Sequence, residues 1–317
     1  MKSNLAGVIA ISLVASFVTS APLPRFLKVS PHFYYLRSAG DEGNVGAVVT
    51  DDGVILIDTQ RERNVPQVLE SLKRVTAKPV AWVVNTHHHE DHTGGNAYFL
   101  TRNVPVIGSR ETLLLLEKAT GEVPVAAPAE KSANLPDPPL SFSFWRQMQL
   151  FPAGVEVRIS SVGHKAHTGG DVVISLPAEK ILYVGDLYRA GSYPIIDGSG
   201  GGSALGWLDG TKEVVESVKL LKSAMPQPKP SPSAAPAPEK TLEEAIIVIP
   251  GHGPATNLKE LKGLLEASQK LRAEIGRALA SGRSRDALLS SPASDPFRSY
   301  KNFEAYASQL YDDLARK

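Results

Sequence analysis

The sequence predicts an α/β protein, a four-layer αβ/βα sandwich of two mixed β-sheets flanked by helices. Its 317 residues can bury a large core, and the length fits one domain of two layers with appendages as well as two domains. Two distant segments repeat one order of elements: a hairpin that ends at an aspartate, a helix, and a strand that leads to a histidine. Each half thereby brings an aspartate and a histidine to the same edge. Such halves place a site in the cleft between the sheets.

The first half follows this order closely. Asp51-Asp52-Gly53 is a hairpin signal, and the strand after it ends at Asp58. Residues 65–75 carry an apolar stripe with helical spacing. Strands are expected at 33–36, 45–50, 54–57 and 80–85, the last of which leads to His87.

The second half repeats the order with an insertion. Strands at 171–176 and 180–184 flank the turn 177–179, and this hairpin ends at Asp186. A helix over 205–221 and a strand over 245–249 follow, and the strand leads to His252 within Pro-Gly-His-Gly. Most of the insertion is residues 225–240, a Pro/Ala/Ser tract whose composition cannot form a core and favours an extended surface loop.

Two other regions have no counterpart in the repeat. The Pro-containing region 121–140 precedes Phe142, Phe144 and Trp145, which either form a flap over the cleft or a local hydrophobic cluster. Residues 257–279 and 303–314 have helical patterns, so the C-terminal part, 257–317, is expected to supply packing helices.

Four of the eight histidines fall between positions 87 and 92. In an extended segment His87 and His89 project to one side and can bind one ion, while His88 faces away. Asp91 and His92 are expected to open a short helix over 96–100 and suit a second ion. Imidazole and carboxylate ligands without thiolate favour Zn²⁺, with iron, manganese or cobalt as alternatives. A solvated histidine cluster would need neither the buried strand before it nor the Gly-Gly after it.

Further ligands are expected where the repeat places them. His164 and His167 both precede the second hairpin, and we favour His167 because it abuts a Thr-Gly-Gly turn. His164 is then left to support a ligand or to contact solvent. Asp186 can bridge two ions, although a helix cap is the structural alternative. His252, between two glycines, completes the ligands of the second ion.

These motifs carry a resemblance to a known family. The run His87-x-His89-x-Asp91-His92 matches the H-x-H-x-D-H signature of the metallo-β-lactamase-fold hydrolase superfamily, and the later ligands match its later motifs. The chain resembles this superfamily over about residues 45–253, with a ligand set similar to that of glyoxalase II and lactonases. Asp58 matches the family's early aspartate, which orients the ligands. The resemblance implies one metal on His87, His89 and His167, a second on Asp91, His92 and His252, and Asp186 as a bridge.

The resemblance also implies a reaction. Two Zn²⁺, or iron or manganese, would activate water, lowering its pKa towards about 7. Asp91, Asp186 and a bridging hydroxide offset three of the four positive charges, so the site stays positive and can stabilise an oxyanion. We expect metal-bound hydroxide to attack a lactam, lactone, ester or thioester carbonyl without a covalent enzyme intermediate. Asp91 is the candidate catalytic residue because it can also steer the proton of the nucleophile.

Other functions stay open from the sequence. A chain without cysteine excludes the β-lactamases that use cysteine on the second metal, and Asp186 favours thioester hydrolases, lactonases and phosphodiesterases. A mononuclear iron sulfur dioxygenase and a metal-binding protein without catalysis are the remaining alternatives. Tyr188 and Tyr193 are candidate substrate contacts because they follow Asp186. The glycine run 198–202 lacks the Lys-Ser/Thr of a phosphate loop and is expected to be a flexible connector.

The N-terminal residues favour export. Lys2 precedes the apolar run 5–18 and small residues, which is the order of a secretory signal over 1–20, with cleavage favoured after Ser20 over Ala21. The run is shorter than the roughly 20 residues of a membrane span, so the remaining 21–317 domain is expected to be secreted or periplasmic, without stable membrane insertion. A formal net charge of +1 disfavours nucleic acid, and a small molecule is the expected partner.

Overall fold

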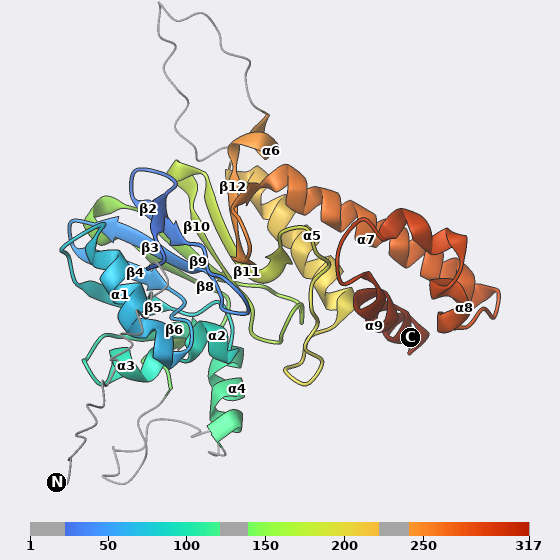
Figure 1. Cartoon of the computed structure of the whole chain (residues 1–317), viewed down its shortest axis with the longest axis horizontal. Coiled ribbons are helices and arrows are strands. Elements are labelled where there is room, and N and C mark those ends of the chain that lie inside the picture. The colour runs from blue at the N-terminus through green and yellow to red at the C-terminus, as the bar shows by residue number, and fades with distance from the viewer. Residues whose placement is uncertain (1–22, 121–138, 222–240, 317) are drawn as a thin grey trace, which may run out of the picture.

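The computed structural model describes residues 23–120, 139–221 and 241–316 of the chain. The predicted signal segment, most of the 121–140 region and the proline-rich tract 225–240 lie outside these residues. Two β-sheets pack face to face in the described part, and helices cover their outer surfaces (Figure 1). The predicted four-layer αβ/βα sandwich is therefore confirmed.

The first sheet has seven strands in sequence order. The first four strands pair antiparallel, and the last four, beginning with β4, pair parallel. The strands are β1 (Phe26–Lys28), β2 (Phe33–Leu36), β3 (Val45–Thr50), β4 (Gly53–Ile57), β5 (Val80–Val84), β6 (Val106–Ser109) and β7 (Phe142–Phe144). The helical segments of this half are η1 (Glu62–Asn64), α1 (Val65–Lys73), α2 (Glu90–Thr93), α3 (Asn96–Leu100) and α4 (Arg110–Thr120).

The second sheet has six strands in the order β13-β12-β11-β10-β9-β8, and only β11 and β12 pair parallel. The strands are β8 (Gln147–Leu150), β9 (Val157–Ser161), β10 (Val172–Leu176), β11 (Ile181–Arg189), β12 (Ile247–His252) and β13 (Thr256–Asn257). The helical segments are η2 (Pro152–Gly154), η3 (Pro177–Glu179), α5 (Ala204–Leu221), α6 (Leu242–Ala245), α7 (Leu258–Ala280), α8 (Arg285–Leu289), η5 (Pro292–Phe297) and α9 (Phe303–Ala315).

Three apolar clusters explain the layers. One lies between the sheets and includes Phe33, Ile57 and Tyr183. A second packs α1 against the first sheet, and a third packs α5, α7 and α9 against the second sheet. All five residues of β4 and of β10 are buried, as expected for strands covered on both faces.

The parallel pairs position the site. β4 and β5 run side by side, with Ile57 opposite Val84, so Asp58 and the histidine-rich loop emerge at one edge. β11 and β12 do the same for Asp186 and His252. Because parallel strands present their carboxyl ends at the same edge, both halves deliver their polar residues into one region.

Three predicted boundaries were wrong. The strand that ends at His252 starts at Ile247, because Thr241 and Glu244 form a capping box that holds the four residues Leu242–Ala245 as a helix. β11 continues beyond Val184 to Arg189. Asp91 and His92 lie in the separate short helix α2, rather than at the start of α3.

The aromatic segment at 142–145 connects the two sheets. Phe144 is buried between them, while Phe142 is 50% and Trp145 71% exposed. The rings of Phe142 and Trp82 lie 6.1 Å apart. Phe142 and Phe144 therefore agree with the local-cluster alternative. Among the helices in the described part of the chain, none has both the length and the apolarity needed to cross a membrane.

Candidate metal centre

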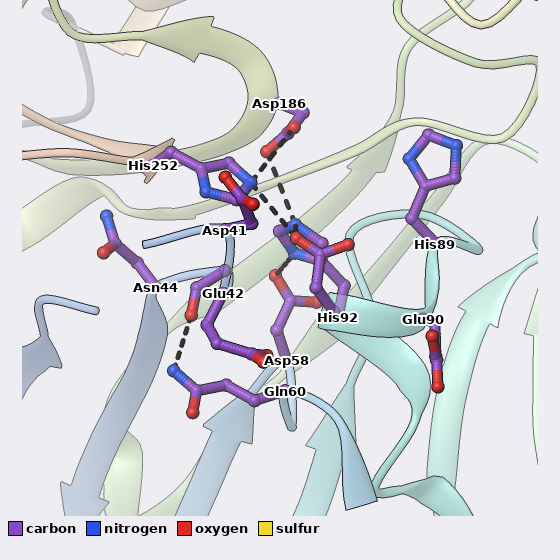
Figure 2. A network of polar contacts seen from close by, with 12 residues as sticks. Asp41, Glu42, Asn44, Asp58, Gln60, His89, Glu90, His92, Asp186 and His252 are labelled. Atoms are coloured by element: carbon purple, nitrogen blue, oxygen red, sulfur yellow. Dashed lines mark hydrogen bonds and ion pairs between the residues drawn. The ribbon is translucent and has the colours of Figure 1, made fainter. Parts of the chain in front are cut away.

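Histidines and aspartates from both halves meet at the edge where the parallel strands end (Figure 2). The loop after β5 supplies the first histidines, α2 supplies Asp91 and His92, and the loop after β9 supplies His167. Asp186 projects from β11, and His252 ends β12. All seven residues predicted as metal ligands lie in this one cluster.

The first group contains His87, His89 and His167. The Nδ1 atom of His89 lies 3.0 Å from the Nε2 atoms of both His87 and His167. His87 and His167 are buried, with exposures of 1% and 2%, whereas His89 is partly exposed. Three ring nitrogens therefore converge at a place that is open to solvent only on the His89 side.

The second group contains Asp91, His92 and His252. Asp91 Oδ2 lies 3.3 Å from His92 Nε2 and 3.2 Å from His252 Nε2. Asp186 lies between the two groups: its Oδ1 is 3.4 Å from His92 Nε2, and its Oδ2 is 3.4 Å from His252 Nε2 and 3.9 Å from His167 Nε2. This is the position that a bridging carboxylate requires.

The donors at this centre fit a metal ion. Candidate ligand atoms within each group lie within 4.8 Å of one another. His92 Nε2 and Asp186 Oδ1 are buried, and neither has a hydrogen-bond partner within the described part of the chain. Burying such atoms without a partner is costly, and a divalent cation between them would satisfy both. Imidazole and carboxylate donors without sulfur are typical ligands of zinc, iron and manganese.

Hydrogen bonds fix which nitrogen each histidine presents. His92 Nδ1 donates to Asp58 Oδ2 at 2.8 Å, and His167 Nδ1 donates to the Ile195 carbonyl at 2.7 Å. His87 Nδ1 lies 3.1 Å from Thr86 Oγ1, which itself donates to Asp58. These partners leave the Nε2 lone pairs of the three histidines facing the centre.

Asp58 is the predicted orienting residue, and its geometry suits that role. Its carboxylate accepts from the Thr86 amide at 2.8 Å, from Thr86 Oγ1 at 2.9 Å and from His92. Asp58 is fully buried and has a φ of 61°, a conformation rarely adopted by residues other than glycine. Asp58 thus acts directly on His92 and, through Thr86 Oγ1, on His87.

The charges of the cluster shift its pKa values in opposite directions. Burial lowers the pKa of His87 well below its usual value, and neighbouring histidines lower it further. Burial alone would lower the pKa of His92, but the carboxylates of Asp58, Asp186 and Asp91 raise it well above its usual value. Burial would raise the pKa of Asp186, but its histidine neighbours hold it well below the usual range. The Asp186 carboxylate is therefore ionised at neutral pH.

Asp197 is a site residue that the sequence analysis missed. His89 Nε2 donates to Asp197 Oδ2 at 3.0 Å, so His89 presents Nδ1 to the first group. Ser199 Oγ and the Gly200 amide donate to Asp197 Oδ1 at 2.6 and 2.9 Å. His88 also approaches Asp197, at 3.6 Å, and forms a third potential ligand group with Asp197 and His89. No sequence motif marks this aspartate.

The glycine run 198–202 packs against the centre, contrary to its predicted role as a flexible connector. A Cβ atom on Gly200 would lie 2.7 Å from His88 Cε1, and one on Gly202 would lie 2.2 Å from the His167 carbonyl oxygen. Glycine is required there because backbone and imidazole occupy the space of a side chain.

Three other candidates lie away from the cluster. The predicted substrate contacts Tyr188 and Tyr193 are only 3% and 0% exposed and belong to the core under α5, α7 and α9. Tyr193 stacks on Tyr306 with ring centroids 4.9 Å apart. The prediction that both tyrosines contact the substrate was therefore wrong. His164 is exposed and its Nε2 lies 3.3 Å from Glu213 Oε2, which agrees with the choice of His167.

The fold and the cluster define a class of protein: an αβ/βα sandwich that gathers histidines and aspartates where its two halves meet, as metal-dependent hydrolases do. The family model described as "Metallo-beta-lactamase superfamily" matches residues 39–252, and the chain belongs to this superfamily. The sequence-based resemblance is thereby confirmed.

Solved structures of this family share the fold. A metallo-beta-lactamase from Pontibacter korlensis superposes with a TM-score of 0.59 at 20% identity, covering 78% of this chain and 99% of its own. The DIM-1 metallo-beta-lactamase gives a TM-score of 0.57 at 19% identity, covering 78% and 98%. The FIM-1 enzyme from Pseudomonas aeruginosa, in a mono-zinc form, gives 0.56 at 19% identity, covering 78% and 95%. Similarity at this level establishes the fold.

Proposed function

We propose that the chain is an exported dinuclear metal-dependent hydrolase that cleaves a small carbonyl compound, a lactam, lactone, ester or thioester. One observation carries the proposal: two groups of ligand atoms meet around the shared carboxylate of Asp186. Two Zn²⁺ are the favoured ions, with iron or manganese as alternatives. Zinc supplies Lewis acidity, which polarises a carbonyl and makes water a better nucleophile at neutral pH.

Different residues bind the ions, orient the ligands and exclude water. His87, His89 and His167 would hold the first ion, and Asp91, His92 and His252 would hold the second, with Asp186 between the two groups. Asp58, Thr86 and the Ile195 carbonyl lock the imidazoles in the tautomers that bind. Burial of His87, His92 and Asp186 excludes water from the inner side, so attack comes from the partly exposed side.

Asp91 is the proposed catalytic residue. Its side chain is 15% exposed, so solvent and substrate can reach it, whereas Asp186 is 7% exposed. Burial would raise the pKa of Asp91, but hydrogen bonds from His252 and His92 lower it well below its usual range. The ionised carboxylate can therefore accept a hydrogen bond from the attacking water, which steers its proton and orients its lone pair toward the carbonyl carbon.

The choice of substrate class rests on Asp186 and on the absence of cysteine. The chain has no cysteine, which excludes the β-lactamases of the superfamily that bind the second metal through a thiolate. This favours lactones and thioesters over lactams. The signal-like residues 1–20 support secretion or a periplasmic location for the mature protein.

A substrate panel tests this function. Purified zinc-loaded protein is assayed with lactones, thioesters, the lactam nitrocefin and phosphodiesters. We expect hydrolysis of a carbonyl substrate, reduced to background in His89→Ala and Asp186→Ala along with the loss of bound metal. His164→Ala is the matched control, because this exposed histidine lies on the loop that carries His167 but outside the cluster. One iron per chain with thiol-dependent oxygen uptake, or cleavage of phosphodiesters alone, would contradict the proposal.

A further inference from the structure

We propose that Gly43 is a positioning residue that sets the space available to the second ion, the one assigned to Asp91, His92 and His252. The inference rests on the proposed function and deepens it. Gly43 lies near the end of the loop between β2 and β3, and Figure 2 shows its neighbours Glu42 and Asn44 between Gln60 and His252. The sequence pattern gave this glycine no role.

The backbone of Gly43 lies directly against the second ligand group. An ideal Cβ atom at Gly43 would lie 2.7 Å from His92 Cε1, 2.8 Å from His92 Nε2 and 2.8 Å from the Asp91 carbonyl oxygen. Real Cβ atoms essentially never approach other atoms this closely, so a side chain here forces a shift. The crowded atom His92 Nε2 is the one that faces Asp91 and Asp186.

His92 cannot move away without losing its orientation. Its side chain is fully buried, its Nδ1 is bonded to Asp58 at 2.8 Å, and its ring lies 4.2 Å from that of His87 between centroids. The Asp91 carbonyl belongs to the backbone of α2. If His92 or Asp91 moved to relieve the clash, a ligand of the second ion would therefore be displaced.

The loop that carries Gly43 is held equally firmly. The Gly43 carbonyl accepts from Gln60 Nε2 at 2.7 Å and from Ser38 Oγ at 2.6 Å. The next residue, Asn44, donates its amide to the Gly251 carbonyl at 2.7 Å and its Nδ2 to the carbonyls of Pro250 and Gly253 at 2.8 and 2.9 Å. Asn44 thus fixes the loop to the turn that presents His252.

Because of these contacts, a substitution at Gly43 tests the space around the ligands of the second ion. Its φ is outside the left-handed region, so alanine can adopt its backbone conformation. None of the three nearest atoms that an added Cβ would meet belongs to His87, His89 or His167. A methyl group at position 43 therefore contacts the ligands of the second ion directly and can reach those of the first only through His92.

The test is a zinc titration of Gly43→Ala with a competing chelator. We expect wild type to bind two ions per chain, and the variant to bind the first with unchanged affinity and the second at least about tenfold more weakly, because a displaced histidine coordinates poorly. Cobalt spectra then retain the band of one site and lose that of the other. The control is Gly276→Ala, an exposed helical position where an added Cβ meets nothing within 4 Å.

A second variant tests the same contact from the side of the loop that carries Gly43. Gln60→Ala removes a hydrogen bond that holds the Gly43 carbonyl, so the double variant Gly43→Ala/Gln60→Ala should regain part of the second-ion affinity as the loop moves aside. Equal second-ion affinity in wild type and Gly43→Ala, or additive losses in the double variant, would overturn the role of Gly43. A wild-type protein that binds no second ion would instead refute the proposed function.

Discussion

Three histidines of the centre each have one nitrogen bonded to a partner outside it, and this detail decides what the cluster can bind. Asp58 holds His92, Asp197 holds His89, and the Ile195 carbonyl holds His167. The protonated nitrogen faces the partner, so the other nitrogen keeps its lone pair for a cation. Two of these three partners are carboxylates, which also increase the basicity of the ligand nitrogen.

Asp197 can be tested by truncation. Asp197→Ala removes the acceptor for His89 Nε2, so His89 loses its fixed tautomer and ring orientation. We expect the affinity of the first zinc to fall by about 10- to 100-fold. Chelator competition measures it, with Asp209→Ala, an exposed aspartate on α5, as the control. Unchanged first-site affinity in Asp197→Ala would show that Asp197 does not position His89.

The pKa shifts predict that acid removes the second ion first. Burial lowers the pKa values of His87 and His89, so these two of the three histidines in the first group are neutral and ready to bind at neutral pH. At His92 and His252, neighbouring carboxylates outweigh the effect of burial and raise the pKa of each imidazole. Both histidines must therefore release a proton before they bind metal. Below those pKa values, second-site affinity should fall by about tenfold per pH unit for each protonated histidine.

Zinc titrations at pH 8 and pH 6 measure this order. The expected result is a larger loss of affinity at the second site than at the first. Parallel losses at the two sites would mean that the carboxylates around His92 and His252 do not control proton competition.

At the scale of elements, local patterns were enough for most strands and for the long helices. The apolar run ahead of His87 became β5, and the stripe over 257–279 became α7, because hydrophobic spacing and burial agree there. Tyr188 was misplaced because β11 is irregular. Its register against β12 shifts on both sides of Gly185, so the position of Asp186 in the cleft does not carry over to Tyr188. Asp197 could not be predicted, since only tertiary packing brings it to His89.

The C-terminal helices are predicted to stabilise the fold without shaping the metal centre. Trp207 on α5 is fully buried, its ring centroid lies 5.7 Å from that of Tyr306 on α9, and its Nε1 donates to the Leu187 carbonyl at 2.8 Å. Trp207→Ala should lower the free energy of unfolding by about 3–5 kcal/mol, measured in urea. Zinc stoichiometry should stay unchanged.

Trp145→Ala is the matched control for this prediction. Trp145 is 71% exposed, so its removal should change the free energy of unfolding by no more than about 0.5 kcal/mol. Equal destabilisation by the two substitutions would contradict the assignment of Trp207 to the core.

At the scale of the whole molecule, the centre joins the two halves of the sandwich. The first sheet carries Asp58 and leads to His87, while the second carries Asp186 and His252. Asn44 adds direct hydrogen bonds from the first half to the loop of His252. A cation bound between the halves therefore stabilises their packing as well as providing the chemistry.

Metal removal should consequently lower thermal stability. A ligand at 100 times its dissociation constant stabilises the folded state by about 2.7 kcal/mol per site. For a chain of 317 residues, that corresponds to a Tm increase of about 4 °C per site. Differential scanning calorimetry of chelator-treated and zinc-loaded protein measures the difference, and Asp186→Ala should reduce it. Equal Tm values for the two forms of the wild type would contradict metal binding between the halves.

Anomalous diffraction at the zinc edge tests most directly whether seven residues from both halves hold two neighbouring ions. Crystals of zinc-loaded protein should show two peaks per chain. One peak should be surrounded by the nitrogens of His87, His89 and His167, the other by Asp91, His92 and His252, and Asp186 should contact both. The absence of a peak at this cluster, or a single peak with Asp186 turned away from it, would contradict the account.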